Sequence, residues 1–296
     1  MDKTLRHVIC QTTAQHLNMG HLVAGQCLRA VGNVGNTVPE RDDLTELPCS
    51  DVAGAYFVVG MALAGKRPML ILRYQGFSWF AASAIVNYAA KSKEIWGRPC
   101  PMLIRAISNE GGIGPVAGSS HHSLFLRMPG VKIFSPMTPN EWKSAYDEFM
   151  SGDDVVFLSE HRGAWGNDKD LKPKTQDEYP DIVLFPISIT RFAVREATDE
   201  IFWRTVIHDI YRIKSFSPSE KAIEDLKLSR FGGIVIDDDY PDGTAKALAL
   251  DLHNLTGAKM HVLGLEDRTA GFSTQTDNLP PNTEKIKSFI RSIITV

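Results

Sequence analysis

Residues 50–91, SDVAGAYFVVGMALAGKRPMLILRYQGFSWFAASAIVNYAAK, decide the fold class of this chain. Small and apolar residues fill positions 51–64, which predicts a helix packed closely against a sheet, and Gly65 can end it. The run Met69–Leu72 predicts a buried strand, and a second helix is expected over 79–93. A short apolar strand between two helices is typical of a parallel sheet covered on both faces.

Apolar strands and helices continue to alternate on the C-terminal side of this stretch. Strands are expected in PCPMLIRAI, VKIF and VVFL, at residues 99–107, 131–134 and 155–158. The helix EWKSAYDEFM at 141–150 precedes the last of them, and either Thr138 or Asn140 can cap it. We therefore predict an α/β fold built on parallel sheets.

A polar segment separates this series of elements from a second one. Residues 166–180, GNDKDLKPKTQDEYP, contain almost no apolar side chains and cannot add much to a core. The second series comprises the strand DIVLF, a helix near 192–205, the strand RTVIHDIYRI, the helix SPSEKAIEDLKL, the strand GGIVIDDD, a helix near 243–255, the strand KMHVLGL and a helix near 282–293. We expect one domain at 1–166, a linker at 167–180 and a second domain at 181–296.

Composition excludes several classes of protein. The formal net charge of -3 gives no basic excess for nucleic acid or an anionic membrane surface. The four cysteines form no C-x-x-C pair, so they predict neither a metal knuckle nor a redox couple. The first twenty residues lack the pattern of a signal peptide, and no run of eighteen apolar residues occurs. We expect a soluble cytoplasmic protein.

Four residues near the first predicted strand have both a structural and a functional interpretation. Asp51 stands at a helix start, where capping of free amides is the better interpretation of its position alone. Tyr74, Phe77 and Phe80 follow the strand at i, i+3 and i+6, which usually indicates aromatic packing between sheet and helix. Binding of a flat ring is the alternative for these three side chains.

The loop after the next strand contains glycines and two histidines. His121 and His122 lie among serines where a parallel sheet usually places its ligands, and a solvated polar loop is an equal alternative. The preceding glycines, GGIGPVAG, form a G-x-G-x-x-x-G pattern from Gly112. Nucleotide binding by this loop is a weak alternative, because no long amphipathic helix follows it directly.

Read together, these segments resemble a known family. Residues 50–91 resemble the run in the β subunit of the 2-oxo acid dehydrogenase E1 component in which a catalytic carboxylate begins a helix, G-x-R-P follows, and an aromatic residue precedes I-V-N-x-A-A-K. PMLIRA, the His loop, PGVKIFSP and VVFLSEHR resemble later stretches of that family and of the matching transketolase domains. DIVLFPIS, the strand near Ile207 and GGIVIDDD resemble the C-terminal transketolase domain, so the resemblance implies a pyrimidine-binding domain followed by that domain.

The resemblance implies a thiamine diphosphate-dependent enzyme that cleaves or transfers a C–C bond of a 2-oxo acid or ketose through a thiazolium ylid. Asp51 matches the carboxylate that hydrogen-bonds the aminopyrimidine, where the family has glutamate. The side chain is one methylene shorter, so the same bond requires a shift of roughly 1 Å, and such a misplacement can cost about 10²-fold in rate. Glu46 precedes the helix and is a poor substitute.

Other site residues are also implied by the resemblance. Phe77 matches the aromatic residue that lies against the pyrimidine ring, and Tyr74 and Phe80 are expected to line the same pocket. His122 matches the loop histidine near the substrate, a proton donor or oxyanion partner, in preference to His121.

The resemblance also implies a partner chain. We find no G-D-G followed by an asparagine pair, the family's magnesium and diphosphate motif; SGDD at Ser151 and DDDYPDG at Asp237 match it only in composition. We therefore expect no metal ligands on this chain. An α-type subunit would hold the cofactor's diphosphate and Mg²⁺, and the two chains would form an α2β2 heterotetramer.

Two questions stay open at this level. The segment HLNMGHLVAGQCLRAVGNVGNTVPE lacks the acidic strand ending in G-E-D that dehydrogenase β subunits have, so dehydrogenase and transketolase chemistry are not distinguished. The aspartate at position 51 also leaves room for a non-catalytic structural or regulatory subunit that keeps the fold without turnover.

Overall fold

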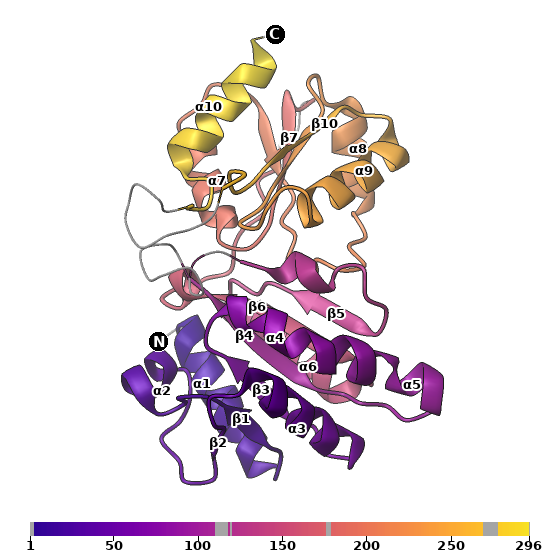
Figure 1. The fold of residues 1–296 in the computed structure, drawn as a ribbon. Coiled ribbons are helices and arrows are strands. Elements are labelled where there is room, and N and C mark those ends of the chain that lie inside the picture. Colours follow the sequence, from indigo (N-terminus) through magenta and orange to yellow (C-terminus); the bar gives the residue numbers. More distant parts are fainter. Residues whose placement is uncertain (1–2, 110–117, 119, 176–178, 269–277, 296) are drawn as a thin grey trace.

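Two parallel α/β units stack on each other in the computed structural model (Figure 1). The structure describes residues 3–109, 118, 120–175, 179–268 and 278–295. All strand pairs within both sheets are parallel. The predicted fold class, an α/β chain with two parallel-sheet domains, is confirmed.

The first sheet has six strands in the order β2-β1-β3-β4-β6-β5. Its strands are β1 (Val23–Gly25), β2 (Thr45–Glu46), β3 (Met69–Leu72), β4 (Leu103–Ser108), β5 (Val131–Phe134) and β6 (Val155–His161). Their helical connections are α1 (Leu5–Asn18), α2 (Ala30–Asn36), α3 (Asp51–Leu63), η1 (Gln75–Phe77), α4 (Ser78–Ala84), η2 (Ile85–Ala89), α5 (Ala90–Trp96), η3 (His122–Phe125), α6 (Pro139–Ser151) and η4 (Arg162–Ala164).

The central strands β3, β4 and β6 are buried on both sides, so apolar residues cover both faces of this part of the sheet. Alternate residues of β3 enter different cores: Leu70 packs in the cluster with α3 and α4, whereas Ile71 packs in the cluster with α1 and α6. This two-sided burial explains why β3 appears in the sequence as an unbroken apolar run.

The second sheet has four strands in the order β10-β9-β7-β8. They are β7 (Ile182–Pro186), β8 (Thr205–Ile207), β9 (Gly233–Ile236) and β10 (Met260–Leu263). The helices of this unit are α7 (Thr190–Asp199), α8 (Glu220–Leu228), α9 (Thr244–Thr256) and α10 (Thr283–Ile294).

Five elements differ from the sequence-based expectation. The helix α1 and the strands β1 and β2 were not predicted. The helix expected at 79–93 is three segments, because a π-helical turn, η2, separates α4 from α5. The strand expected in RTVIHDIYRI ends at Ile207. The residues that follow run along the free edge of β5 instead. There the Ile213 amide donates to the Ile133 carbonyl at 2.9 Å, and Arg212 forms an antiparallel bridge with Phe134.

The polar segment between the sheets contacts both units: the Asn167 carbonyl accepts from the Leu5 amide at 2.7 Å, and the described residues from Lys172 onward lie along the second unit. Lys174 forms an isolated antiparallel bridge with Ile207, and the Lys172 carbonyl accepts from Arg195. All strands of the first sheet precede residue 162 and those of the second follow residue 181. We keep 1–166, 167–180 and 181–296 as the proposed division.

Candidate functional site

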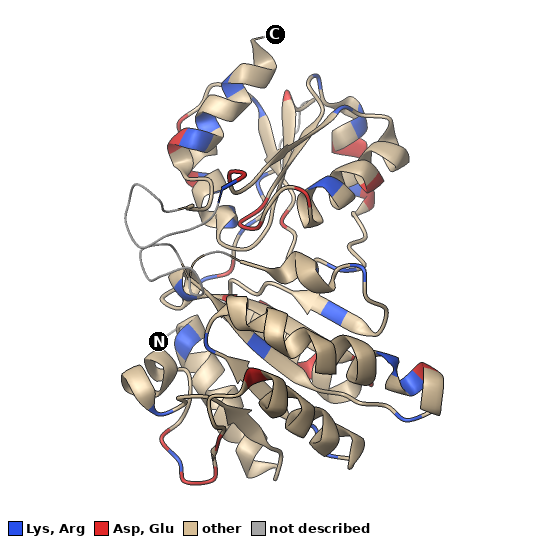
Figure 2. Cartoon of the chain, viewed as in Figure 1, with Lys and Arg blue, Asp and Glu red and all other residues tan. Residues whose placement is uncertain are grey.

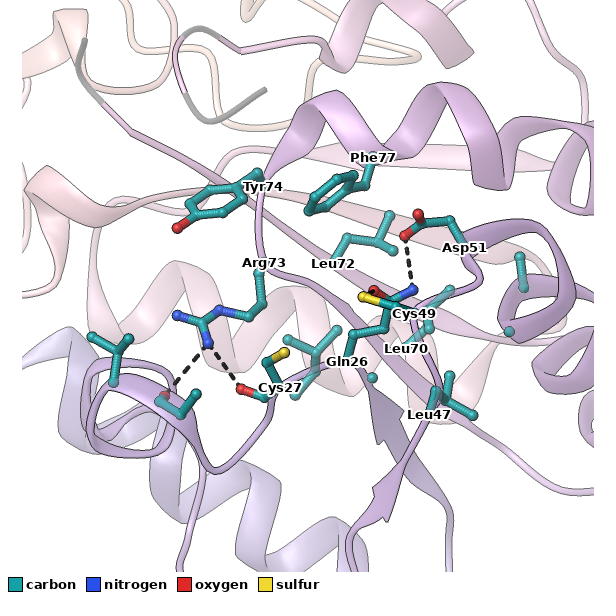
Figure 3. A pocket seen from close by; sticks show the side chains of 16 residues that line it. Gln26, Cys27, Leu47, Cys49, Asp51, Leu70, Leu72, Arg73, Tyr74 and Phe77 are labelled. Atoms are coloured by element: carbon teal, nitrogen blue, oxygen red, sulfur yellow. Dashed lines mark hydrogen bonds between the residues drawn. The ribbon is translucent and has the colours of Figure 1, made fainter. Parts of the chain in front are cut away.

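A cavity of about 330 Å³ lies at the carboxyl ends of β1 and β3 (Figure 3). Parallel sheets commonly bind ligands at such strand ends. Gln26 follows β1, Tyr74 follows β3, Phe77 ends η1, and Asp51 begins α3. Most of the wall is apolar, with a few polar side chains at its edge, which is the usual composition of a small-molecule site.

Asp51 directs its carboxylate into this cavity and does not cap its helix. Ser50 is the N-cap residue of α3 and makes no side-chain capping bond. The Oδ1 atom of Asp51 accepts a hydrogen bond from Nε2 of Gln26 at 3.0 Å. Within the described residues no protein donor contacts Oδ2, so this oxygen can accept from a ligand.

Gln26 is a site residue that the sequence did not predict. Its Oε1 accepts from the Cys49 thiol at 3.5 Å while its amide group donates to Asp51, so a single side chain links two sides of the cavity. The sequence feature that could have identified Gln26 as a site residue is its position directly after a strand, in the tripeptide G-Q-C at residues 25–27. Glu46 lies outside the cavity, and its Oε1 accepts from the Leu28 amide at 2.7 Å.

Two of the three predicted aromatic residues line the cavity. The rings of Tyr74 and Phe77 are half-buried, with centroids 5.9 Å apart and an interplanar angle of 48°. Figure 3 shows both rings along one side of the cavity, with the Gln26–Asp51 hydrogen bond beside Phe77. The expectation for Phe80 needs correction: this side chain belongs to α4, is 55% exposed and does not line the cavity.

The wall opposite the aromatic rings has an unusual backbone. Residues 31–36 all have φ between 51° and 64°, which makes α2 a left-handed turn. Each non-glycine residue in this conformation costs about 1–2 kcal/mol. Arg73 anchors the segment that leads into the turn, because its guanidinium donates to the carbonyl of Cys27 at 2.9 Å and to that of Ala30 at 3.5 Å. Such strain is commonly found at ligand sites.

The structure does not bring His122 to the cavity. Its side chain is fully buried, with Nε2 at 3.1 Å from Asp237 Oδ1 and Nδ1 at 3.3 Å from Ser159 Oγ. Burial opposes the charged imidazolium, but Asp237 and its neighbours outweigh burial and raise the pKa of His122. A catalytic role for His122 stays a prediction, and this geometry gives it no direct access to a ligand in the cavity.

His121 is the more exposed of the two histidines. Its ring lies edge-on to Trp79 with centroids 6.2 Å apart, and its backbone amide donates to Gln75 Oε1 at 2.7 Å. Burial lowers the pKa of His121. The glycine pattern from Gly112, on which the nucleotide alternative rests, lies outside the described residues except for Gly118.

The cavity fits a heteroaromatic ring with a hydrogen-bond donor. Apolar side chains such as Leu70 and Leu72 would contact its faces, Phe77 can stack against it, and Asp51 Oδ2 can accept from a ring N–H. These are the features that an aminopyrimidine requires.

The two parallel sheets give this chain a transketolase-like fold, and its first domain carries the family match. Residues 42–167 match the family described as the transketolase pyrimidine-binding domain. The resemblance inferred from the sequence is thereby confirmed for this part of the chain.

Curated relatives are β subunits. The chain is 30% identical over 131 residues to the β subunit of acetoin:2,6-dichlorophenolindophenol oxidoreductase from Cupriavidus necator, covering 42% of this chain and 38% of that protein. It is 30% identical over 129 residues to the β subunit of 2-oxoisovalerate dehydrogenase from Bacillus subtilis, covering 40% and 38%. The human mitochondrial pyruvate dehydrogenase E1 β subunit is 24% identical over 138 residues, covering 46% and 38%. The matched region thus spans about two fifths of these relatives.

A solved structure matches both domains. It is described as a split gene transketolase, inactive beta4 tetramer, and it superposes with a TM-score of 0.74 over 100% of this chain and 99% of that chain at 12% identity. This match shows the shared fold. Among the described residues, we find no helix whose length and apolarity would let it cross a membrane.

Proposed function

We propose that this chain is the β-type subunit of a two-chain thiamine diphosphate-dependent enzyme and supplies the pyrimidine half of its cofactor site. The observation that carries the proposal is the Asp51 carboxylate beside Phe77 in an apolar, ring-sized cavity. The domain match at residues 42–167 and the β-subunit relatives support it. The substrate would be a 2-oxo acid or a ketose.

Each residue at the cavity would have a defined role. Bound thiamine diphosphate supplies an electron sink for cleavage or transfer of a C–C bond. Asp51 would accept a hydrogen bond from the pyrimidine ring through Oδ2, and Gln26 holds its other oxygen. Phe77 and Tyr74 would pack on the ring and exclude water. Gln26 holds the Asp51 carboxylate in one orientation at the start of α3. It would therefore reduce the conformational freedom of a side chain that is one methylene shorter than the usual glutamate.

An exposed apolar surface beside the cavity supports a partner chain. We call it the aromatic face; its exposed side chains are Val52, Tyr56, Phe57, Trp79, Phe80, Tyr88, Ile95 and Trp96. Figure 2 shows α3 and α4 free of charge apart from the start of α3. Clustered exposed apolar and aromatic residues are typical of protein interfaces.

We propose that the α-type chain docks on the aromatic face, holds the diphosphate and Mg²⁺, and completes an α2β2 assembly. The face is continuous with the cavity because α3 begins at Asp51 and α4 follows Phe77 directly. This placement would give Phe80 a role in the interface instead of the cofactor pocket. A cytoplasmic location is part of the same proposal.

The experiment pairs this chain with candidate α-type chains encoded beside its gene. Calorimetric titration of thiamine diphosphate with Mg²⁺ should show tight binding only for the pair. Exchange of the thiazolium C2 proton in the pair should fall by about 10²-fold or more in Asp51→Asn. Glu46→Gln is the matched control, because that carboxylate lies outside the cavity and its amide analogue can still accept from Leu28. Tight Mg²⁺-dependent binding by this chain alone, or unchanged exchange in Asp51→Asn, would refute the assignment.

A non-catalytic structural or regulatory subunit is the second candidate. The shorter Asp51 side chain, with one oxygen already bonded to Gln26, favours it. In that case the pair would bind cofactor without accelerating exchange, and Asp51→Glu would raise the exchange rate. A lipoyl-bearing acyltransferase encoded nearby would favour dehydrogenase over transketolase chemistry.

A further inference from the structure

A second cluster of ionisable side chains lies buried where the two units meet. His122 begins η3 of the first unit, and Asp237, Asp238 and Asp239 follow β9 of the second. The parallel register pairs Pro186 of β7 with Ile236 of β9, so the carboxyl ends of these strands lie side by side at the junction. This topology brings three carboxyl groups of the second unit to the imidazole of His122, and His121 of the first unit interacts electrostatically with Asp239.

The cluster carries more acidic than basic groups. Asp237, Asp238 and Asp239 are at most 1% exposed, and the first two form ion pairs with the single imidazole of His122. Burying carboxylates without compensating charge is costly. Additional positive charge, as protons or as a bound cation, is therefore needed at this junction.

Asp238 has one satisfied oxygen and one unsatisfied oxygen. Its Oδ2 accepts from Ser120 Oγ at 2.7 Å and from Ser188 Oγ at 2.8 Å. Its Oδ1 is buried and has no hydrogen-bond partner within the described part of the chain, and it faces Nδ1 of His122 at 4.0 Å. A buried oxygen without a partner is rare in native proteins, and a bound ion is one explanation for such an atom.

The distance between these two atoms leaves room for a metal ion between them. Metal–nitrogen and metal–oxygen bonds are about 2.0–2.2 Å, so one ion can contact both Nδ1 and Oδ1 when these atoms lie 4.0 Å apart. One candidate ligand atom each from His122, Asp237 and Asp238 lies within 4.8 Å of the others.

The surroundings of His122 also fit a ligating imidazole. Nε2 faces Asp237 at 3.1 Å, and a carboxylate on the second ring nitrogen is the usual orienting partner of a metal-bound histidine. At Nδ1 the competing partner is Ser159 Oγ at 3.3 Å; this oxygen accepts from Gln75 at 2.7 Å and can donate its own proton to Nδ1, so an ion at Nδ1 would replace a long hydrogen bond. A donor set of imidazole and carboxylate suits a divalent first-row metal ion, and Mn²⁺ is the member of this series whose paramagnetic signal reports its ligands.

We propose that His122 and Asp238, with Asp237 as the orienting carboxylate, bind one Mn²⁺-type divalent ion that joins the two units. The ion is structural and distinct from the Mg²⁺ assigned to the partner chain. This site departs from the sequence-based expectation that the chain has no metal ligands. It does not depend on thiamine diphosphate binding.

The test uses the full chain after chelation and dialysis. Titration with Mn²⁺, followed by its electron paramagnetic resonance signal, should show one bound ion per chain, and Asp238→Asn should weaken binding by at least about ten-fold. Asp225→Asn is the matched control: Asp225 is also buried and bonded to a histidine, His208, at 2.9 Å, but it lies on α8, and binding should not change.

Spectroscopy of the unmutated chain keeps the proposal testable if Asp238→Asn does not fold. Bound Mn²⁺ should show coupling to a histidine nitrogen. No binding by the unmutated chain, or bound Mn²⁺ without nitrogen coupling, would overturn the proposal. Burial raises the pKa of Asp238, so protons are the alternative source of compensating charge. In that case the unfolding free energy of the metal-free chain would decrease as the pH rises and would not change when Mn²⁺ is added. This result would also overturn the proposal.

Discussion

His16 is a buried imidazole of α1 that remains neutral in the folded chain. Its Nδ1 lies 2.8 Å from the Tyr146 hydroxyl, and burial lowers the pKa of His16 to about 4. The unfolded chain regains a pKa near 6.5, so it binds more protons than the folded chain between these values. The stability contributed by neutral His16 is complete above pH 6.5 and is lost as the pH falls toward 4.

We expect protonation of unfolded His16 to remove about 2 kcal/mol of unfolding free energy between pH 7.5 and pH 5. Urea denaturation at both pH values measures the loss. His16→Gln should show a smaller loss, whereas His7→Gln, at an exposed position of the same helix, should keep the loss of the unmutated chain. Equal losses in all three proteins would contradict the assignment to His16.

Three of the predicted site residues line one cavity, because each lies near a strand or helix end where chain position fixes side-chain placement: Asp51, Tyr74 and Phe77. Their roles toward a cofactor stay predictions. The positions of Phe80 and His122 could not be predicted from the sequence. Phe80 is exposed because of the rotation of α4 about its axis, and His122 is held by Asp237, which lies far away in the sequence.

The left-handed turn α2 stands out among the secondary-structure elements. Val31 is 71% exposed with φ of 51°, so it carries the strain of a β-branched residue without burial to offset it. We expect Val31→Gly to raise the unfolding free energy by about 1 kcal/mol, because glycine adopts this conformation without a steric penalty.

Urea denaturation of two glycine variants checks this expectation. Val34 has the same backbone conformation but is buried, so Val34→Gly should lose core contacts and be destabilised. Destabilisation by Val31→Gly as well would mean that the turn is not strained at that position.

From Asp51 onward element types were predictable from periodicity, but breaks within elements were not, and α1, β1 and β2 were not predicted. The helix-strand-helix order from Asp51 to Trp96 follows the apolar pattern of the sequence. The π-helical turn at Ile85–Ala89 leaves no proline or glycine signal. The strand near Ile207 is short because its continuation finds backbone partners on β5, a tertiary competition that local sequence does not report.

At the scale of the whole molecule, the aromatic face should control assembly. We expect Phe57→Glu on α3 and Trp79→Glu on α4 each to weaken association with the α-type chain by at least about 30-fold, the effect of losing an interface residue worth 2 kcal/mol. Analytical ultracentrifugation of the mixed chains measures the association. Leu250→Glu is the control, because Leu250 is equally exposed on α9 of the second unit, and reduced association there would argue against a specific docking face.

The segment that leaves β8 also determines what can be cut from this chain. Arg212 and Ile213 occupy the outer edge of β5, so removing everything after residue 166 would strip a hydrogen-bonded border from the first sheet. An exposed edge strand of this kind pairs with strands of other molecules and promotes aggregation. The region that matches the family is therefore smaller than the smallest fragment of this chain that we expect to stay soluble.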